Sequence, residues 1–262
     1  MVRSRVPRKI LGVIPARYAS SRFPGKPLAR IDSRTIIEHV YERVSMARYL
    51  GTVLIATDDE RILEEARRFG ARAVMTRADH ASGTDRVAEV ASTFEDAELV
   101  VNIQGDEPLI DPGAIDAAVL PLLDEPAIPM GTLKKRIEIA REIADPNVVK
   151  VVTNRFENAV YFSRATIPFG RDAAQDARPV AYYKHVGLYV YRRDFLLRYP
   201  DLPVGPLERA EKLEQLRALE NGFTIRVVET DYESLGVDTP ADLEYVREMF
   251  RAGREAVQVA HG

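Results

Sequence analysis

The chain has 262 residues, of which 46% are apolar and 29% charged, a composition ordinary for a globular protein built as one large α/β domain or as one domain with a subordinate lobe. It contains no cysteine, which excludes structural disulfides and thiolate metal sites and fits a reducing cytoplasm. The formal net charge of −3 and the lack of a run of roughly 18 apolar residues argue against nucleic acid and membranes as partners, so we expect a cytoplasmic protein.

Apolar strands and amphipathic helices alternate through the first half of the chain. We predict strands over 10–14, 52–56, 71–75 and 99–103, and helices over 34–48, from a cap at Asp58 or Asp59 to Gly70, over 84–93 and over 112–123. Strands that alternate with helices imply right-handed crossovers and a sheet covered on both faces. The fold class is therefore α/β, with a doubly wound, mainly parallel sheet.

The second half of the chain has a less regular pattern. We predict strands over 148–152, 159–162, 185–191 and 223–229, a helix over 206–219, a loop over 168–182, and a last helix from 239 to about 252. A soft boundary near residue 130 separates a first part (1–130) from a smaller second lobe (131–232). We expect the C-terminal segment (233–262) to return to the first part, so that both parts share one core.

A basic loop follows the first predicted strand, in the run Ile14 to Pro27 (IPARYASSRFPGKP). It carries Arg17, Arg22 and Lys26, and its glycine and small residues let the backbone approach a ligand closely. In open α/β sheets, ligands bind outside the carboxyl ends of the strands, so this loop is placed to bind a triphosphate. On spacing alone, a solvated basic loop is an equal alternative.

Two aspartates are candidate metal ligands. Asp106, in QGDEP, directly follows the fourth predicted strand and faces the same crevice as the basic loop, where Mg²⁺ fits between a carboxylate and a polyanion. The alternative is an aspartate that only caps a turn. Asp238, in GVDTPADL, precedes the last predicted helix. If Thr239 caps that helix, Asp238 is free to reach the metal, and the sequence does not decide between these roles.

The segment Arg77 to Arg86 (RADHASGTDR) joins the third predicted strand to a helix. Ser82 and Gly83 stand at the expected helix start, which suits contacts to a base, ribose or phosphate. A lone histidine in such a segment more often stabilises the loop than catalyses, so we expect that role for His80.

Further candidates in the second half are polar residues suited to a hydroxyl-rich acid. Arg164 is a possible bidentate clamp for a carboxylate. His185 and Tyr189 lie four residues apart on a predicted strand and therefore share a face. Glu214 and Gln215 fall on the predicted helix over 206–219, where taken alone they indicate a solvated face.

Taken in order, the segments IPARYASSRFPGKPL, TRADHASGTDR, NIQGDEP, YFSRATIP, KHVGLY, LEQLR and GVDTPADL resemble the 3-deoxy-D-manno-octulosonate cytidylyltransferase family, which makes CMP-Kdo for lipopolysaccharide. The resemblance extends from Gly12 to about Phe250. It implies a fold like that of nucleotide-diphospho-sugar transferases and a homodimer. It also implies CTP and Mg²⁺ at the sheet edge, and a second lobe that serves sugar-acid binding and dimerisation.

The resemblance also assigns roles to individual residues. It implies that Arg17, Arg22 and Lys26 hold the triphosphate and that Ser82 and Gly83 lie at the cytidine. It implies that Asp106 and Asp238 bind magnesium and form the catalytic set with Arg17 and Lys26. The residues expected to face the sugar acid are Gln104, Arg164, His185, Tyr189, Glu214 and Gln215. The segment 168–182 carries no motif, so no site residue is assigned to it.

The implied reaction is attack of the sugar's anomeric 2-hydroxyl on the α-phosphorus of CTP, with release of pyrophosphate. No residue in the sequence stands out as a general base. Two alternatives stay open: a cytidylyltransferase for another sugar acid, such as the 8-amino analogue of Kdo or a neuraminic acid, and a non-catalytic nucleotide-binding regulator on the same fold. The presence of the full set Arg17, Lys26, Asp106 and Asp238 argues against the regulator, because a regulator need not keep both candidate metal carboxylates.

Overall fold

The computed structural model describes residues 9–19, 22–171 and 180–260. Ser20 and Ser21 of the basic loop and residues 172–179 of the predicted loop over 168–182 lie outside this part of the chain. None of the helices in the described ranges is both long and apolar enough to cross a membrane.

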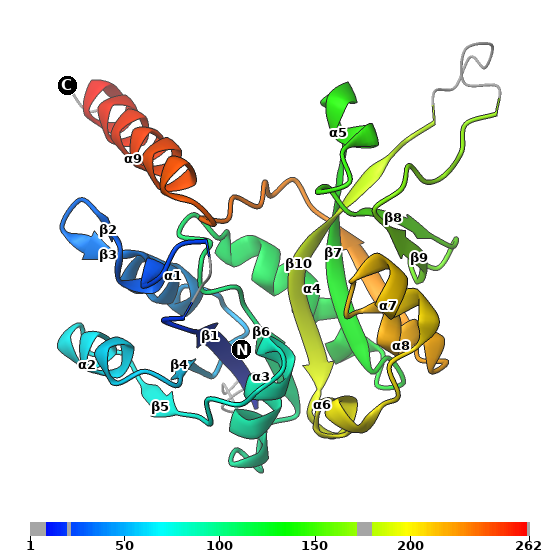
Figure 1. The fold of residues 1–262 in the computed structure, drawn as a ribbon, viewed down its shortest axis with the longest axis horizontal. Helices are drawn as coiled ribbons and strands as arrows, with labels where there is room; N and C mark the ends of the chain where they lie inside the picture. The colour runs from blue at the N-terminus through cyan, green and yellow to red at the C-terminus, as the bar shows by residue number, and fades with distance from the viewer. Residues whose placement is uncertain (1–8, 20–21, 172–179, 261–262) are drawn as a thin grey trace, which may run out of the picture.

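Within the described residues, nine strands form one sheet that runs through the molecule (Figure 1). Its central order is β11-β7-β10-β6-β1-β4-β5, with β8 paired to β10 and β9 paired to β8. The strands are β1 (Ile10–Ala16), β4 (Thr52–Thr57), β5 (Ala73–Met75), β6 (Leu99–Asn102), β7 (Met130–Arg136), β8 (Lys150–Thr153), β9 (Ala159–Ser163), β10 (Tyr183–Arg192) and β11 (Ile225–Glu229). β1 is parallel to β4 and β6, whereas β10 is antiparallel to β6 and β7. The predicted fold class is confirmed, as a mixed sheet in which parallel pairs dominate the first half.

Helices cover both faces of the sheet. They are α1 (Ile36–Ser45), α2 (Glu60–Arg68), α3 (Gly83–Ser92), α4 (Pro112–Asp124), α5 (Ala140–Ala144), α6 (Arg193–Arg198), α7 (Pro206–Glu211), α8 (Leu216–Glu220) and α9 (Pro240–Ala260). Side chains of β1 alternate between two cores: Ile14 packs with α1 and α4, whereas Val13 packs with α3 and α6. Burial on both faces explains why β1 is an unbroken apolar run.

Both cores extend across residue 130. One contains Ile14 together with Leu133 and Val237, and the other contains Val13 together with Phe162 and Ile225. Leu243 and Val246 of α9 join the first of these cores, so the C-terminal segment packs on the first part of the chain. The sheet is continuous across the expected boundary, and the division of the chain into separate parts stays a prediction.

The predicted helix over 206–219 is wrong. Lys212 has a left-handed backbone conformation (φ 54°) that ends α7, and α8 begins only at Leu216. The break is stabilised by tertiary contacts, because the Tyr199 hydroxyl donates a hydrogen bond of 2.8 Å to the carbonyl oxygen of Glu214. Glu214 and Gln215 consequently lie in a turn and not on a helix.

Strand β7 was missed by the sequence pattern, because two lysines and an arginine follow each other in MGTLKKR. Lys134 is nevertheless buried, and its ammonium group donates to Thr153 (2.9 Å) and pairs with Glu157. Such pairing between distant segments leaves no local signal. Helices α5 and α6 and the short hairpin of β2 (Arg30–Ile31) and β3 (Arg34–Thr35) were also not predicted.

Candidate active site

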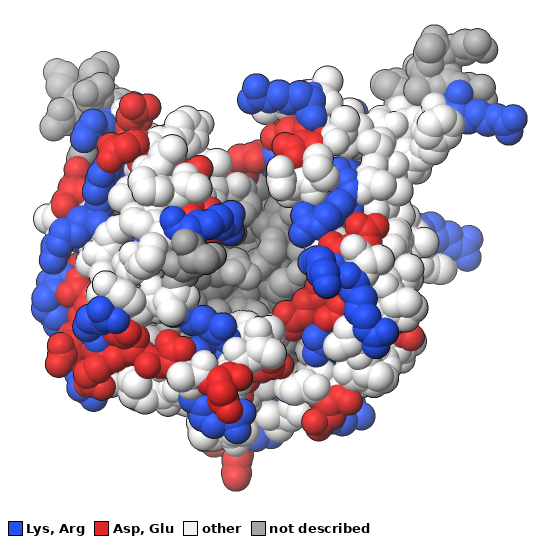
Figure 2. All heavy atoms as spheres, viewed as in Figure 1, with Lys and Arg blue, Asp and Glu red and all other residues white. Residues whose placement is uncertain are grey.

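Two neighbouring cavities, each of about 290 Å³, lie where β1 and β6 end. The basic cavity is lined by residues of the basic loop and of QGDEP, among them Arg17, Lys26 and Asp106. The tyrosine cavity is lined by Thr84, Asn102, Tyr189, Tyr191, Tyr199, Glu214 and Gln215. Both cavities share Pro15, Gly83 and Gln104 as lining residues. In the space-filling view the molecule is hollowed at its centre, with basic and acidic side chains around the hollow (Figure 2).

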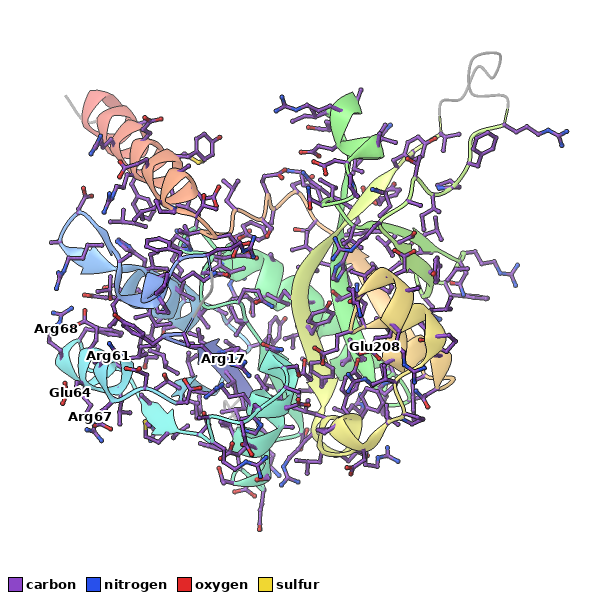
Figure 3. All side chains as sticks on the ribbon, viewed as in Figure 1. Arg17, Arg61, Glu64, Arg67, Arg68 and Glu208 are labelled. Carbon is purple, nitrogen blue, oxygen red and sulfur yellow. The ribbon has the colours of Figure 1, made fainter. Side chains whose placement is uncertain are left out.

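The basic loop begins where β1 ends and is tied to the start of α3. Arg17 donates from Nη2 to the carbonyl oxygens of His80 (2.6 Å) and Ser82 (3.2 Å). In Figure 3 Arg17 lies at the centre of the molecule, whereas the labelled charged side chains of α2 lie at its outer edge. Gly25 has a left-handed backbone conformation (φ 72°), which favours glycine. Its N–H donates to the carbonyl oxygen of Tyr18 (2.8 Å). This turn directly precedes Lys26.

Lys26, Asp106 and Asp238 come from three distant segments and meet at one point. Lys26 Nζ lies 2.5 Å from Asp106 Oδ2 and 3.0 Å from Asp238 Oδ1, and Arg22 Nη2 lies 3.0 Å from Asp238 Oδ2. Burial lowers the pKa of Lys26, but the two carboxylates outweigh burial and raise that pKa above its usual 10.5. The ammonium group is therefore charged at neutral pH.

The N-terminal cap of α9 leaves the Asp238 side chain available. Thr239 N donates to Asp242 Oδ2 (2.8 Å), and Asp242 N donates to Thr239 Oγ1 (3.2 Å). Thr239 and Asp242 thus cap the helix reciprocally. The sequence left open whether Asp238 caps the last helix or is free to reach the site. Its carboxylate is free of the cap and pairs with Lys26 and Arg22.

Glu107 is a positioning residue beside the site, and sequence reasoning assigned it no role. It is buried, and it accepts hydrogen bonds of 2.7 Å from the Tyr232 hydroxyl and from Ser234 Oγ. Burial raises its pKa. The backbone N–H of Val237 also donates to the carbonyl oxygen of Asp106 (2.9 Å). These contacts hold the returning segment in register, so that Asp238 arrives beside Asp106.

The donor set around Lys26 suits a magnesium ion that carries substrate phosphates. The structure, in the ranges it describes, brings no group of three or more histidine, cysteine, aspartate or glutamate side chains together at one point. The carboxylates of Asp106 and Asp238 nevertheless converge on a single cation, Lys26 Nζ. Mg²⁺ is commonly held by one or two carboxylates, with waters and phosphate oxygens as its other ligands. The residues present fit that arrangement.

Most of the predicted sugar-acid residues line the tyrosine cavity. Gln104 donates from Nε2 to the carbonyl oxygen of Gly187 (3.1 Å), which fixes its side chain beside the shared wall. The turn between α7 and α8 places Glu214 and Gln215 at the cavity and not on a solvated helix face. Gln215 is only 4% exposed, and its Nε2 has no hydrogen-bond partner among the described residues. Tyr191 and Tyr199, which also line this cavity, were not predicted.

His185 and Tyr189 share a face of β10, as predicted, with ring centroids 5.4 Å apart. Tyr189 lines the tyrosine cavity, and burial raises its pKa. His185 is not among the residues that line either cavity, and its Nε2 lies 2.9 Å from Thr132 Oγ1. Burial lowers the pKa of His185 from 6.5 to about 3, so its imidazole is neutral at physiological pH.

Arg164 is not brought to either cavity. Its Nε donates to the carbonyl oxygen of Glu211 (2.8 Å), and its Nη1 donates to that of Pro146 (3.0 Å). The guanidinium group therefore holds neighbouring segments of the second lobe together, and a direct contact between Arg164 and a sugar acid stays a prediction.

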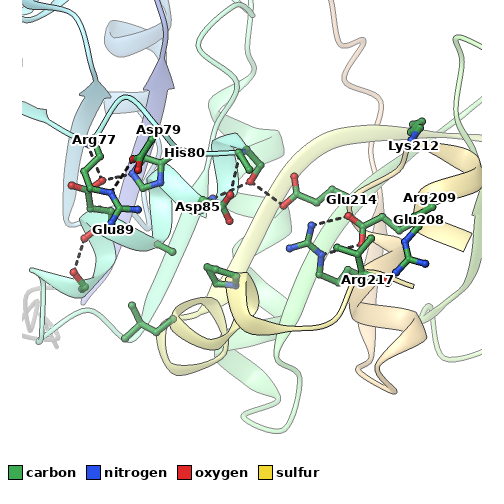
Figure 4. A pocket seen from close by; sticks show the side chains of 17 residues that line it. Arg77, Asp79, His80, Asp85, Glu89, Glu208, Arg209, Lys212, Glu214 and Arg217 are labelled. Atoms are coloured by element: carbon green, nitrogen blue, oxygen red, sulfur yellow. Dashed lines mark hydrogen bonds and ion pairs between the residues drawn. The ribbon is translucent and has the colours of Figure 1, made fainter. Parts of the chain in front are cut away.

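A third and larger cavity, of about 900 Å³, lies between α3 and the segment from α6 to α8 (Figure 4). Its charged side chains pair with one another: Arg217 with Glu208 (2.7 Å) on one wall, and His80 with Glu89 on the other. His80 therefore stabilises its loop, the role expected for it. Glu214 lines both this cavity and the tyrosine cavity, so it separates the two.

Gly105→Ala is expected to lower the free energy of unfolding by about 1–3 kcal/mol and to weaken binding of CTP, the nucleotide that the sequence resemblance implies. A Cβ at this position lies 2.7 Å from the carbonyl oxygen of Pro15, and neither backbone can yield without moving a strand end or Asp106. Denaturant unfolding and calorimetric titration with CTP measure the two effects. Gly236→Ala is the control, because its Cβ meets nothing within 4 Å. Equal behaviour of the two variants would contradict the prediction.

Glu214→Gln is expected to become more stable relative to the unmutated protein as the pH rises from 4 to 7. Burial raises the folded-state pKa of Glu214, so this carboxyl contributes stability below its unfolded pKa and loses it as the pH rises through the folded one. Urea unfolding at several pH values measures the difference. Glu211→Gln should show the opposite trend, because hydrogen bonds from Ser163 and Arg164 outweigh burial and lower the pKa of Glu211. Parallel trends would refute this interpretation.

Comparison with known proteins places the chain in a family. The family described as cytidylyltransferase matches residues 11–228. The 3-deoxy-manno-octulosonate cytidylyltransferase of Solibacter usitatus (strain Ellin6076) is 69% identical over 247 residues, which cover 94% of this chain and 96% of that protein. The protein of the same name from Syntrophotalea carbinolica is 60% identical over 247 residues, covering 92% of this chain and 98% of that protein.

Solved structures agree with these matches. A CMP:2-keto-3-deoxy-manno-octonic acid synthetase complexed with CTP is 46% identical and superposes with a TM-score of 0.88, covering 93% of this chain and 99% of that one. A cytidylyltransferase from Leptospira borgpetersenii, 21% identical with a TM-score of 0.57 and covering 91% of this chain and 85% of that one, shares the fold alone. On sequence and structure together, the chain belongs to the 3-deoxy-manno-octulosonate cytidylyltransferase family.

Proposed function

We propose that this protein transfers CMP from CTP to the anomeric hydroxyl of 3-deoxy-D-manno-octulosonate, releasing pyrophosphate and forming CMP-Kdo for lipopolysaccharide synthesis. The observation that carries the proposal is the convergence of Lys26, Asp106 and Asp238 at the basic cavity, which shares a wall with a tyrosine-lined cavity of similar volume. One cavity has the charges for a triphosphate, and the other has the hydroxyl and amide groups for a sugar.

The nucleotide occupies the basic cavity in this proposal. Lys26, Arg17 and Arg22 supply positive charge for the triphosphate. The capping box of Ser82 with Asp85 starts α3 and leaves Gly83 at the wall between the cavities, where backbone N–H groups and the helix dipole favour an anion. A Cβ at Gly83 would meet only Pro15 Cγ, at 3.8 Å. The protein itself does not require glycine there, which supports close approach of a ligand.

The sugar acid occupies the tyrosine cavity. Tyr189 and Gln215 offer hydrogen-bonding groups, and Gln104 lies at the wall between the two cavities. Burial raises the pKa of Glu214, and the carboxyl group of this residue lines the same cavity. Because Gln104 lines both cavities, a sugar hydroxyl beside it would lie close to the α-phosphate of a nucleotide in the basic cavity.

The reaction needs alignment and charge neutralisation more than a covalent intermediate. Lys26 and the two arginines would stabilise the charge that develops on the departing pyrophosphate. Asp106 and Asp238 would hold Mg²⁺, which when bound polarises the phosphate oxygens. The neutral imidazole of His185 packs against the ring of Tyr189, and its contact with Thr132 holds the imidazole in place.

We also propose that the protein is a cytoplasmic homodimer that associates through its second lobe. Large apolar side chains are exposed there: Ile139, Phe156, Val160 and, at 86% exposure, Phe169. Several exposed large apolar side chains within one lobe make that lobe the candidate surface for a protein partner. Sedimentation equilibrium of the unmutated protein and of a Val160→Lys variant tests the assignment, since a monomer in both cases would refute it.

Pyrophosphate release from CTP is the direct test of the proposed function. We expect release with Kdo and Mg²⁺, slower release with the 8-amino analogue and with neuraminic acid, and almost none from the Asp106→Asn variant. Preference for another acid would reassign the substrate within the same reaction. Tight binding of CTP without pyrophosphate release for any acid would support the regulator and overturn the proposal.

A further inference from the structure

Asn102 is a buried polar residue whose side-chain oxygen has no hydrogen-bond partner among the described residues. It ends β6, and its neighbours across the sheet are Val13 of β1 and Tyr189 of β10. The residue is 3% exposed and lines the tyrosine cavity. Its Oδ1 has no hydrogen-bond partner in the part of the chain that the structure describes. The other three residues of β6, Leu99, Val100 and Val101, are apolar and buried.

Folding alone disfavours an asparagine here. A buried amide oxygen without a partner costs stability, and an apolar side chain of similar shape avoids that cost. Gln215, in the turn between α7 and α8, lines the same cavity. Its Nε2 is also buried and has no hydrogen-bond partner among the described residues. A carboxamide offers an accepting oxygen and an NH₂ group that donates, and a flip of the side chain exchanges their positions. Two carboxamide groups in one cavity, each with one buried atom that has no partner among the described residues, indicate a ligand that pairs with both.

The chemistry of the cavity indicates which part of the ligand this is. No lysine or arginine is among the described residues that line the tyrosine cavity, whereas the basic cavity has Arg17 and Lys26. Phosphate groups are therefore favoured in the basic cavity, and neutral hydroxyl groups in the tyrosine cavity. Amide oxygens accept hydrogen bonds from hydroxyls.

We propose that Asn102 binds a hydroxyl group of the sugar acid and determines specificity for it, together with Gln215. This inference rests on the proposed function, which puts the sugar acid in the tyrosine cavity. A site built to hydrogen-bond a substrate hydroxyl rejects an analogue without it, because the buried protein group is then left unpaired. Asn102 acts on binding and takes no part in the bond changes at phosphorus.

The Asn102→Leu variant separates binding from folding. It replaces an unpaired polar group with an apolar one of the same branching, and the adjoining cavity has room for the larger methyl groups, so we expect an unfolding midpoint equal to or above that of the unmutated protein. The KM for the sugar acid should rise about 10- to 100-fold, and the KM for CTP should change by less than about twofold. Asn221→Leu is the matched control, because the Asn221 amide donates to the carbonyl oxygens of Pro203 and Arg217. The control should unfold more easily and keep its KM for the sugar acid.

Sugar acids that lack one hydroxyl at a time identify the group that Asn102 binds. One such analogue should lose about 10- to 100-fold in kcat/KM with the unmutated protein and almost nothing more with Asn102→Leu, because the same hydrogen bond is already absent. If every analogue loses the same factor in both proteins, or if Asn102→Leu unfolds more easily with an unchanged KM, Asn102 is structural and the inference fails.

Two further arms keep the test decisive. If Asn102→Leu does not fold, Asn102→Ala takes its place with the same analogues. If the unmutated protein releases no pyrophosphate with Kdo, the proposed function fails by itself, and calorimetric titration of the CTP-bound proteins with Kdo then tests Asn102 directly. Weaker binding to the variant supports the inference, and equal binding overturns it.

Discussion

Replacing Asp106 with asparagine is expected to lower kcat about 10²- to 10³-fold and to leave the free energy of unfolding within about 1 kcal/mol. The carboxylate lies 2.5 Å from Lys26 Nζ and faces the basic cavity, so its charge acts where the phosphates are bound. Folding depends on it little, since Lys26 keeps Asp238 as a partner at 3.0 Å. The substitution also leaves the backbone carbonyl of residue 106 in place, which accepts a hydrogen bond from the N–H of Val237.

Pyrophosphate release at several magnesium concentrations measures this effect, and calorimetric titration of the CTP complex with Mg²⁺ measures it without turnover. We expect both the maximal rate and the magnesium affinity to fall. Asp59→Ala is the control: Asp59 caps α2 by accepting from Arg61 N (3.0 Å), so its loss should cost about 1 kcal/mol of stability and no activity. Near-normal turnover of Asp106→Asn at limiting magnesium would refute the metal assignment.

Lys26→Met is expected to lower kcat/KM for CTP about 10²- to 10³-fold. The ammonium group is largely buried between two carboxylates, and its pKa is raised by them, so it carries a full charge into the basic cavity. Without it the triphosphate meets the negative charge of Asp106 and Asp238 with less compensation. The variant should therefore require more magnesium as well as more CTP.

Initial rates over a matrix of CTP and magnesium concentrations distinguish the two requirements. Lys26→Arg keeps the charge but replaces a compact ammonium with a planar guanidinium group, so we expect only partial recovery. Lys9→Met serves as the control for charge alone, because Lys9 forms an exposed pair with Glu98 at 3.8 Å. If Lys26→Met and Lys9→Met bind CTP equally well, Lys26 has no role in holding the triphosphate.

Much of the first half of the fold could be predicted from the sequence, because its elements are specified locally. The strand over 10–14 is observed as β1 (Ile10–Ala16), and the helix over 112–123 as α4, which Asp111 caps and Pro112 opens. Asp59, one of the two aspartates proposed as a cap, is the cap of α2. Burial on both faces produces unbroken apolar runs, and caps have their own residue types, so both signals can be read without knowing what lies opposite.

The second half was predicted less well, because its elements depend on contacts between distant segments. The helix expected over 206–219 is broken at Lys212, where the left-handed residue brings Gln215 into the tyrosine cavity. Strand β7 contains Lys134, whose burial is compensated by Glu157. A charge that is neutralised from another segment looks like a solvated charge in the sequence alone.

The sequence by itself determined the α/β alternation, the position of the basic loop after β1 and the position of Asp106 after β6, since the order of the elements and the turn residues are encoded locally. Only the tertiary structure decided that Asp238 reaches Lys26 from 212 positions away, through the anchoring of Tyr232 and Ser234 on Glu107. It also decided that Asn102 Oδ1, beside a cavity, has no hydrogen-bond partner within the described part of the chain. The physical reason is the same for both: whether a polar group is satisfied depends on what the rest of the chain brings to it.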